Sequence, residues 1–213
     1  MSALLASHGA DIVRALVAVV NENKQGLSDI DGLIGDGDHG INMSRGFTRV
    51  GEQLGDGPQD FAKAFETLGM TLMNEVGGAM GPLYGSIFRA MARSADGKES
   101  IDAATFAEML QASAERVRAL GQAELGDKTL LDVLAPAANA FSTAVAEGAD
   151  FTSALAAAKA AAAAGRDATT DMVAKKGRAS RLGERSRGTP DPGATSCCLI
   201  LTTMADSIQK QLR

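Results

Sequence analysis

Apolar residues recur at helical spacing along almost the whole chain. Between positions 101 and 120, the side chains of Phe106, Met109, Leu110, Val117 and Leu120 fall on one face of a helix. The same spacing recurs in 61–72 and in 197–208. Runs rich in Val, Ile and Tyr that alternate with polar residues, the pattern typical of strands, are absent from the sequence. The pattern therefore predicts an all-α fold.

Start and stop signals divide this pattern into helices. Pro58 suits a first helical position, Ser100 suits an N-cap, and Asp191 followed by Pro192 reads as a cap and a first-turn proline. With 213 residues, no internal repeat and no linker, the chain is predicted to form a single domain over 1–213. The predicted helices are 3–22, 41–53, 58–75, 82–94, 101–120, 130–146, 151–175 and 193–212.

Composition excludes several classes of protein. The formal net charge is −5 and aromatic residues make up 4% of the chain, which disfavours a nucleic-acid partner. No apolar run is long enough to cross a bilayer, so no membrane association is predicted. Cys197 and Cys198 are adjacent, which gives neither a disulfide framework nor a zinc site. With no signal peptide, the sequence predicts a cytoplasmic protein.

The predicted loop 26–40 is acidic and glycine-rich. Clustered carboxylates repel one another unless a cation neutralises them, and Mg²⁺ shared with substrate phosphates fits this loop. An EF-hand is excluded, because the twelfth residue of either frame is Gly40 or Phe47 where a glutamate is needed. The alternative is a solvated acidic turn in which Asp38 caps the next helix. Four aspartates fall within ten residues: Asp29, Asp31, Asp36 and Asp38.

Two further loops suggest phosphate binding. Gly77 to Pro82 opens a predicted helix, and free N–H groups at a helix N-terminus attract phosphate. The alternative there is an ordinary glycine-rich connection. The loop 121–129 resembles a Walker A sequence, but Asp127 intrudes before Lys128 and the loop follows a helix, so the P-loop interpretation is rejected.

The loop 177–193 and the residues just before it are strongly basic in an otherwise acidic protein. Guanidinium groups bind phosphate with a fixed fork geometry, although a solvated charge run is the alternative. A metal–nucleotide site explains the acidic loop, the glycine-rich helix start and the basic loop together. The basic side chains are Lys175, Lys176, Arg178, Arg181, Arg185 and Arg187, against the single acid Glu184.

Four ordered motifs together resemble the DhaL family, the nucleotide-binding subunits or C-terminal domains of dihydroxyacetone kinases. The resemblance runs over essentially the whole chain. The motifs are Gly35-Asp36-Gly37-Asp38-His39-Gly40-Ile41-Asn42, Gly77-Gly78 with Gly81-Pro82-Leu83-Tyr84-Gly85, Gly126-Asp127-Lys128-Thr129, and Gly177-Arg178-Ala179-Ser180 with Asp191-Pro192-Gly193-Ala194.

This resemblance implies an eight-helix antiparallel barrel that binds ADP or ATP in loops at one end. It implies that Asp31, Asp36 and Asp38 ligate a pair of Mg²⁺ ions bridging the phosphates. The residues that would lie along the nucleotide are His39, Gly40, Ile41, Asn42, Gly78, Ala79, Met80, Gly121, Leu130, Arg178, Asp191, Pro192 and Gly193.

The resemblance also implies partner proteins. In this family a separate DhaK-type subunit holds the ketose, and in phosphotransferase-system members a DhaM-type protein rephosphorylates the resident ADP, whereas other members use free ATP. No residue here looks like a catalytic base for the sugar, which fits a kinase subunit of glycerol metabolism that needs its partner. Whether the protein forms a homodimer is left open.

One departure from the family concerns positions 79 and 80. The family has a Ser or Thr pair there, whereas this chain has Ala79 and Met80, so two hydroxyl donors to phosphate are missing. An ATP-dependent kinase subunit for another ketose, such as a tetrulose, is therefore a second hypothesis. A nucleotide-loaded regulatory module that docks to another protein is a third, although such a module would not need the Asp31, Asp36 and Asp38 triad.

Overall fold

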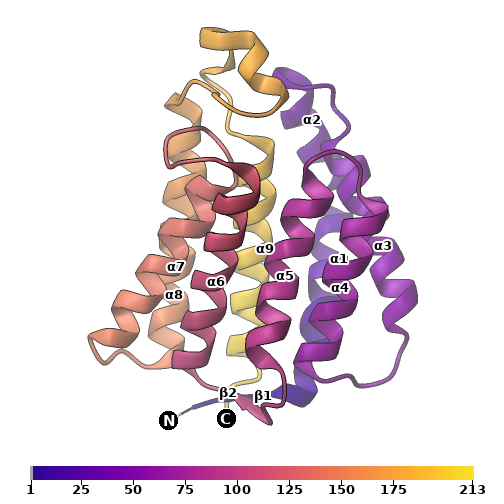
Figure 1. The fold of residues 1–213 in the computed structure, drawn as a ribbon, viewed down its shortest axis with the longest axis vertical. Coiled ribbons are helices and arrows are strands. Elements are labelled where there is room, and N and C mark those ends of the chain that lie inside the picture. Colours follow the sequence, from indigo (N-terminus) through magenta and orange to yellow (C-terminus); the bar gives the residue numbers. More distant parts are fainter. Residues whose placement is uncertain (1) are drawn as a thin grey trace.

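The computed structural model describes residues 2–213, and helices account for nearly all of its regular structure (Figure 1). Within these residues the only strands are β1 (Leu4–Leu5) and β2 (Ser100–Ile101), which pair antiparallel. The all-α prediction is therefore confirmed. The α-helices are α1 (Gly9–Glu22), α2 (Lys24–Ile34), α3 (His39–Leu54), α4 (Phe61–Glu75), α5 (Met80–Ala95), α6 (Ala103–Gly121), α7 (Leu131–Ala146), α8 (Phe151–Ala168) and α9 (Pro192–Gln209).

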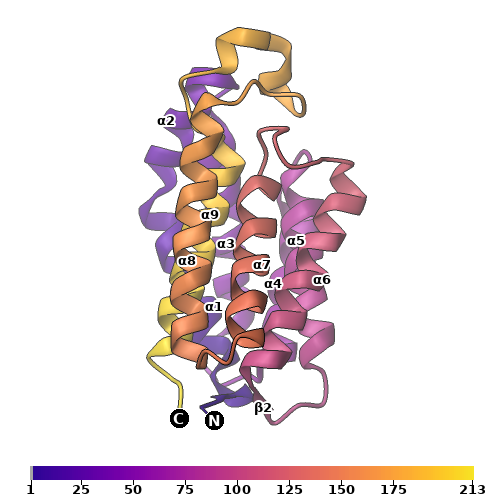
Figure 2. The same ribbon diagram turned by 90° about the vertical axis from the view of Figure 1, so that its left-hand side faces the viewer.

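The helices form a closed antiparallel ring. From α3 to α9 each helix packs against the next one in the chain, α1 packs against α3, and α9 returns to pack against α1. Only Asn23 separates α2 from α1, so the two helices act as one bent unit and the barrel has eight walls over residues 2–213. The two ribbon views show these walls running parallel to one long axis (Figures 1 and 2). This architecture confirms the predicted eight-helix barrel.

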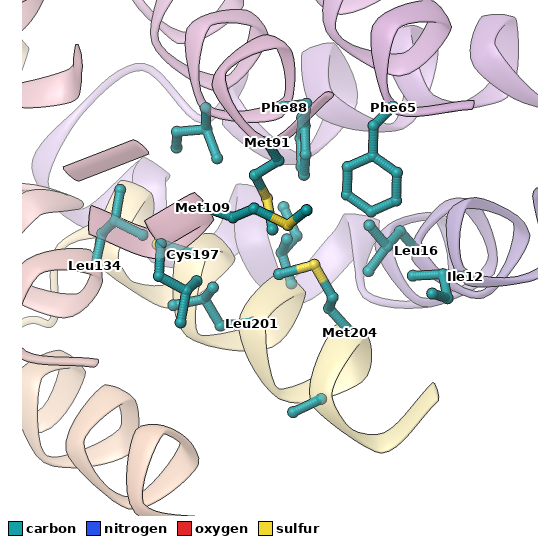
Figure 3. Close-up of a cluster of buried hydrophobic side chains, with 14 of the residues drawn as sticks. Ile12, Leu16, Phe65, Phe88, Met91, Met109, Leu134, Cys197, Leu201 and Met204 are labelled. Carbon is teal, nitrogen blue, oxygen red and sulfur yellow. The ribbon is translucent and has the colours of Figure 1, made fainter. Parts of the chain in front are cut away.

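Apolar side chains fill the barrel. Leu16, Phe65, Phe88, Met109 and Met204 come from five different helices, are no more than 1% exposed and converge near the axis (Figure 3). Burial of each such side chain contributes about 1.5–3 kcal/mol, so this cluster supplies the main stabilisation of the ring. Among the helices of residues 2–213, none is both long enough and apolar enough to cross a membrane.

The prediction of a loop over 26–40 is wrong in its first half, because α2 occupies 24–34. Leu27, Asp31 and Ile34 are buried on one face of this helix at steps of four and three residues. Only two of these three residues are apolar, so the stripe is too short to stand out among the aspartates and glycines of the segment. The difference matters for the site, since Asp31 lies on a helix and not in a loop.

Three predicted helix starts are also wrong. The helix predicted from position 3 begins at Gly9, after β1 and a short 3-10 helix, and the other two share a common reason. The helix predicted from Pro58 begins at Phe61, where the Asp60 carboxylate accepts the N–H of Lys63 at 2.8 Å. The helix predicted to follow a Ser100 cap is capped by Asp102, which accepts the N–H of Thr105 at 2.8 Å. Aspartate competes well for the cap position, and it displaces the start by a few residues.

The helix predicted over 151–175 ends earlier, at Ala168. The chain then continues through the short 3-10 helices η2 (Thr169–Asp171) and η3 (Arg178–Ser186) to α9. We call residues 169–191 the cap segment, and it lies above one end of the barrel (Figure 2). Ala174 and Ala179 of this segment pack with Ile34 at the end of α2. The cap segment therefore spans from α8 across to α2.

The two ends of the barrel differ. At the closed end β1 pairs with β2, and the chain termini are joined by Ala3 N–H donating to Arg213 O at 3.0 Å and by Arg213 N–H donating to Ala3 O at 3.3 Å. Connections 55–60, 96–102 and 147–150 lie at this end. The open end carries connections 35–38, 76–79 and 122–130 together with the cap segment.

Candidate nucleotide and metal site

A cavity of about 520 Å³ lies at the open end. All four connections of that end contribute to its wall, as do the last turn of α2 and the ends of α5 and α6. A volume of this size is within the usual range for a bound small molecule or cofactor. The loops that the sequence singled out therefore meet around one space.

Four helices begin at this cavity, because alternate walls of an antiparallel barrel start at the same end. The first residues or N-caps of α3, α5, α7 and α9 all lie in its wall, namely His39, Ala79, Leu130 and Pro192. In the described chain the N-cap residues of α3, α5 and α7 provide no side-chain cap. The partial positive charge of several helix N-termini therefore faces one space, which favours an anionic ligand.

Three carboxylates gather on the α2–α3 side of the cavity. Asp31, Asp36 and Asp38 each offer an oxygen, and these atoms lie within 4.8 Å of one another. An Asp31 oxygen also accepts the backbone N–H of His39 at 3.2 Å, which anchors the start of α3 to α2. Three hard oxygen donors at this spacing fit Mg²⁺, which combines a few carboxylates with phosphate oxygens and water.

Glycine allows the acidic turn to fold this tightly. Gly37 has a φ of 76°, in the left-handed region that favours glycine. A Cβ atom at Gly35 would lie 2.3 Å from an Asp31 oxygen. Asp36 and Asp38 are thereby turned toward Asp31.

The alternative role for Asp38, as the side-chain cap of α3, is wrong. Within residues 2–213 the Asp38 carboxylate accepts no backbone N–H of that helix. It instead forms an ion pair with Arg178 at 3.3 Å, and Arg178 also pairs with Asp36. The guanidinium from the cap segment thus reaches the carboxylate cluster, and the basic and acidic loops of the sequence meet.

His39 lies in a buried polar network beneath the cavity. Its Nε2 lies 2.9 Å from the hydroxyl of Ser196, which in turn lies 2.7 Å from the hydroxyl of Tyr84. Burial lowers the pKa of His39 to about 4, against the opposing effect of the Asp31 carboxylate, so the imidazole is neutral at pH 7. The network ties together the N-terminal parts of α3, α5 and α9.

Asp191 is an open-end cap that the sequence identified. Its carboxylate accepts the N–H of Ala194 at 2.7 Å, and Pro192 follows as the first residue of α9, as predicted. Burial raises the pKa of Asp191 to about 7, although the N–H of Ala194 opposes this shift. Asp191, Pro192 and Gly193 all line the cavity.

Most of the predicted site residues lie in the cavity wall, and Gly40, Ile41 and Asp36 do not. A Cβ at Gly40 would lie 1.9 Å from the carbonyl of Lys24, so this glycine lets α3 approach α2. Ile41 is 50% exposed on the outer surface. Asp36 belongs to the carboxylate cluster at the rim. The wall includes Asp31, Asp38, His39, Asn42, Gly78, Ala79, Met80, Gly121, Leu130, Arg178, Asp191, Pro192 and Gly193.

Sequence reasoning missed part of the wall. Ile34, Leu83, Val117 and Ala123 form apolar parts of it, and Lys128 contributes a buried stem. Helical periodicity marks such apolar residues as core, and it cannot distinguish a core position from a cavity wall. Lys128 had a signal, since it lies in the Gly126-Asp127-Lys128-Thr129 motif, but nothing in the sequence shows that its side chain is buried.

Comparison with known proteins gives consistent matches. The model of the DAK2 domain family matches residues 33–206. The chain is 42% identical to the ADP-binding subunit DhaL of PEP-dependent dihydroxyacetone kinase 1 from Listeria innocua, over 87% of this chain and 88% of that protein. It is 39% identical to the corresponding DhaL subunit of Escherichia coli, over 84% of this chain and 86% of that one.

Longer kinases match over part of their length. L-erythrulose 1-kinase of Mycolicibacterium smegmatis is 32% identical over 96% of this chain, which covers 38% of that enzyme. The solved structure of the dihydroxyacetone kinase from C. freundii, in complex with AMP-PNP and Mg²⁺, superposes with a TM-score of 0.71 at 25% identity. That match covers 93% of this chain and 33% of the kinase chain.

Proposed function

Because this chain belongs to the DAK2 domain family, we propose that it is the ADP- or ATP-binding subunit of a dihydroxyacetone kinase. It passes a phosphoryl group from the magnesium–nucleotide to a ketose held by a separate DhaK-type subunit. It is thus a phosphotransferase subunit that depends on a partner for activity. A DhaM-type phosphoryl donor, a second Mg²⁺ ion, a homodimer and placement in the cytoplasm stay predictions.

The observation that carries this proposal is the pairing of two features across one cavity. The Asp31, Asp36 and Asp38 carboxylates lie on one side, and the uncapped N-terminus of α5 opens onto the same space. Carboxylates alone would repel phosphate, whereas carboxylates that hold a cation next to free N–H groups attract it. Bound magnesium would supply positive charge that neutralises the phosphate oxygens during transfer.

The remaining wall suits the rest of a nucleotide. Leu83, Val117, Ala123 and Leu130 come from α5, α6 and the connection that follows α6, and they give an apolar surface away from the carboxylates. A flat base is stabilised by burial against such a surface, and its polar edge can reach backbone groups of the connection. Gly121 lies at the end of α6, next to this surface.

The phosphate side lacks hydroxyl donors at the start of α5. Ala79 and Met80 stand there, so the N–H groups of this turn must bind without side-chain help. Each hydroxyl bond would contribute about 1 kcal/mol, so the turn binds phosphate less tightly than one that carries serine or threonine.

A regulatory module that only docks to another protein is the weaker hypothesis, because such a module would not need the Asp31, Asp36 and Asp38 triad.

A second ketose is the other candidate acceptor. The likeness to L-erythrulose 1-kinase favours a tetrulose, although this chain spans only 38% of that enzyme. The acceptor would lie on the partner, so the identity of the sugar depends on the partner subunit. Turnover with dihydroxyacetone and with erythrulose, measured with the same DhaK-type partner, distinguishes the two.

Native mass spectrometry of the purified protein tests the proposal. We expect a mass excess of Mg–ADP, or its appearance when Mg–ADP is added, and loss of that excess with a metal chelator. Addition of a DhaK-type subunit and ketose should then give phosphorylated sugar. If neither Mg–ADP nor Mg–ATP binds the protein at millimolar concentration, the proposed function is wrong.

A further inference from the structure

Lys128 is an unusual residue in this fold. Its side chain is 1% exposed, although lysine is rarely buried, and its φ of 63° lies in the left-handed region that favours glycine. No carboxylate within residues 2–213 forms an ion pair with it. Both the burial and the backbone conformation cost free energy, so other contacts must hold Lys128 in place.

Those contacts are three backbone carbonyls. The Lys128 ammonium donates to Thr169 O at 2.7 Å, to Met172 O at 3.2 Å and to Thr189 O at 2.6 Å. An ammonium group has three protons, so these acceptors satisfy it completely. The groups in direct contact with the charge are therefore backbone dipoles, and the Asp191 carboxylate acts on it without forming an ion pair.

The three carbonyls come from the two ends of the cap segment. Thr169 and Met172 begin the segment, and Thr189 lies near its end. Next to them Gly188 N–H donates to Thr170 O at 2.8 Å, and this bond joins the beginning of the cap segment to its end. Lys128 thus lies between residues 169–172 and residues 188–189, which we call the two legs of the cap segment, and it binds both legs.

The part of the cap segment beyond the two legs is a folded unit of its own. We call the place where the legs meet Lys128 the base of the segment. The buried Ser186 hydroxyl accepts Ala174 N–H at 2.9 Å and donates to Gly183 O at 2.6 Å. From this unit Gly177 and Arg178 reach the cavity wall. A loss of the Lys128 contacts would therefore loosen the cap segment, and its internal hydrogen bonds would open more often.

Lys128 also lines the cavity, next to Thr129 and Leu130. We propose that Lys128 is a positioning residue that clasps the two legs of the cap segment and thereby sets how long a nucleotide stays in the cavity. This inference rests on the proposed function for the identity of the ligand. The clasp itself is a property of the ligand-free protein.

Lys128→Met is the direct test, because methionine keeps much of the apolar stem and removes the ammonium. The three carbonyls then lack a donor and regain one only when the base opens to water. We expect backbone amides across 173–188 to exchange about tenfold faster in the ligand-free protein, with the exchange of α5 and α6 unchanged. A fluorescent ADP analogue with Mg²⁺ should dissociate about tenfold faster, with an association rate within about twofold of the wild type.

Lys128→Gly separates the clasp from backbone strain. Glycine relieves the positive φ and also lacks the ammonium, so it should fold at least as readily as Lys128→Met and show the same faster exchange of the cap segment. Lys159→Met is the matched control, since Lys159 is a partly buried lysine on α8 that pairs with Asp206. It should leave exchange across 173–188 unchanged.

Two results would overturn the inference. The first is unchanged amide exchange across 173–188 in both Lys128 variants, and the second is faster exchange spread evenly over the barrel. If exchange across 173–188 rises in the Lys128 variants but the nucleotide dissociates at the wild-type rate, Lys128 does not set how long the nucleotide stays bound. If the wild-type protein binds no Mg–nucleotide at all, the proposed function fails, and the exchange data still decide whether Lys128 is a clasp.

Discussion

The two ends of the barrel start their helices in different ways. At the closed end α4, α6 and α8 are each capped by an aspartate, namely Asp60, Asp102 and Asp150, whose side chain accepts a first-turn N–H at 2.7–2.8 Å. At the open end, the N-caps of α3, α5 and α7 provide no such bond in the described chain. The contrast has exceptions, because α1 at the closed end lacks a side-chain cap, Asp191 caps α9, and Thr129 Oγ1 accepts the N–H of Leu131 at the start of α7. It is sharpest at α5, whose N-cap residue Ala79 offers no side-chain acceptor at the cavity.

Backbone conformation shows the same contrast. At the closed end the positive-φ residues are Gly55, Gly97 and Gly148, one for each connection. The open end concentrates many more, including two that are not glycine, Gln122 and Lys128. Sparsely populated conformations cost free energy and persist where the surrounding contacts require them. The open end thus gives up local stability for a defined cavity wall.

The largest test of this contrast is Asp36→Asn, which weakens the carboxylate cluster. We expect Mg-dependent ADP affinity to fall by about 100-fold or more, because loss of a metal ligand should cost at least as much as loss of its hydrogen-bonding support. The helical circular dichroism signal should persist, since Asp36 is exposed at the rim. Asp56→Asn, in the closed-end connection 55–60, is the control and should leave affinity unchanged. Equal Mg–ADP affinity in the Asp36 variant and the wild type would show that Asp36 does not belong to a metal site.

Ala79→Asp would make the open end resemble the closed end. An aspartate there can accept the free N–H groups of α5 and places a negative charge where phosphate would bind. We expect about 30-fold weaker Mg–ADP binding, since the lost N–H bonds and the opposing charge each cost on the order of 1 kcal/mol. Isothermal titration calorimetry measures the change. Ala79→Asn, which can cap without charge, separates the two contributions, and unchanged affinity in both variants would mean that phosphate does not face α5.

Asp102→Ala removes a closed-end cap. We expect the free energy of unfolding to fall by about 1 kcal/mol with Mg–ADP affinity unchanged, as measured by urea denaturation. The N–H of Thr105 lowers the pKa of Asp102, so its stabilising effect is present above the usual aspartate pKa of 3.8 and is lost as the pH falls through the lower folded value. The variant and the wild type should therefore converge in stability in acid. A stability difference that persists in acid would contradict this account.

Met80→Ser is the smallest change and adds a hydroxyl at the start of α5. We expect Mg–ADP to bind up to about fivefold more tightly, since one hydroxyl bond contributes about 1 kcal/mol. Met80 packs against the core cluster, so some stability is lost, and a thermal melt measures that loss. Weaker binding would mean that the methionine side chain contacts the nucleotide usefully.

The sequence predicts the barrel well because helical spacing is a local property. Phe106, Met109 and Leu110 are buried on one face of α6, as their spacing requires. The prediction failed for α2, because its buried residues include only two apolar ones, Leu27 and Ile34, beside the polar Ser28 and Asp31. A short helix adjoining a longer one has too few apolar positions to stand out.

The site was predictable where function needs unusual local sequence. Asp38, Gly78 and Arg178 lie in glycine-rich or charge-rich segments, and all three lie in one cavity wall. Leu83 and Lys128 lie in the motifs, but the positions of their side chains were not predictable, because only the tertiary arrangement decides whether an apolar residue lines a cavity or a lysine is buried. Burial of this kind depends on segments far apart in sequence, such as 128 and 189.

Both chain termini lie at the closed end, joined through Ala3 and Arg213, and this has a consequence for covalent fusion. A helix of 16 residues such as α5 is about 24 Å long, so a domain joined to either terminus starts about that far from the cavity. A linker needs about seven extended residues to bring such a domain back to the mouth of the same barrel. With a shorter linker, a fused acceptor domain would have to cover the remaining distance with its own fold or use the cavity of a neighbouring molecule.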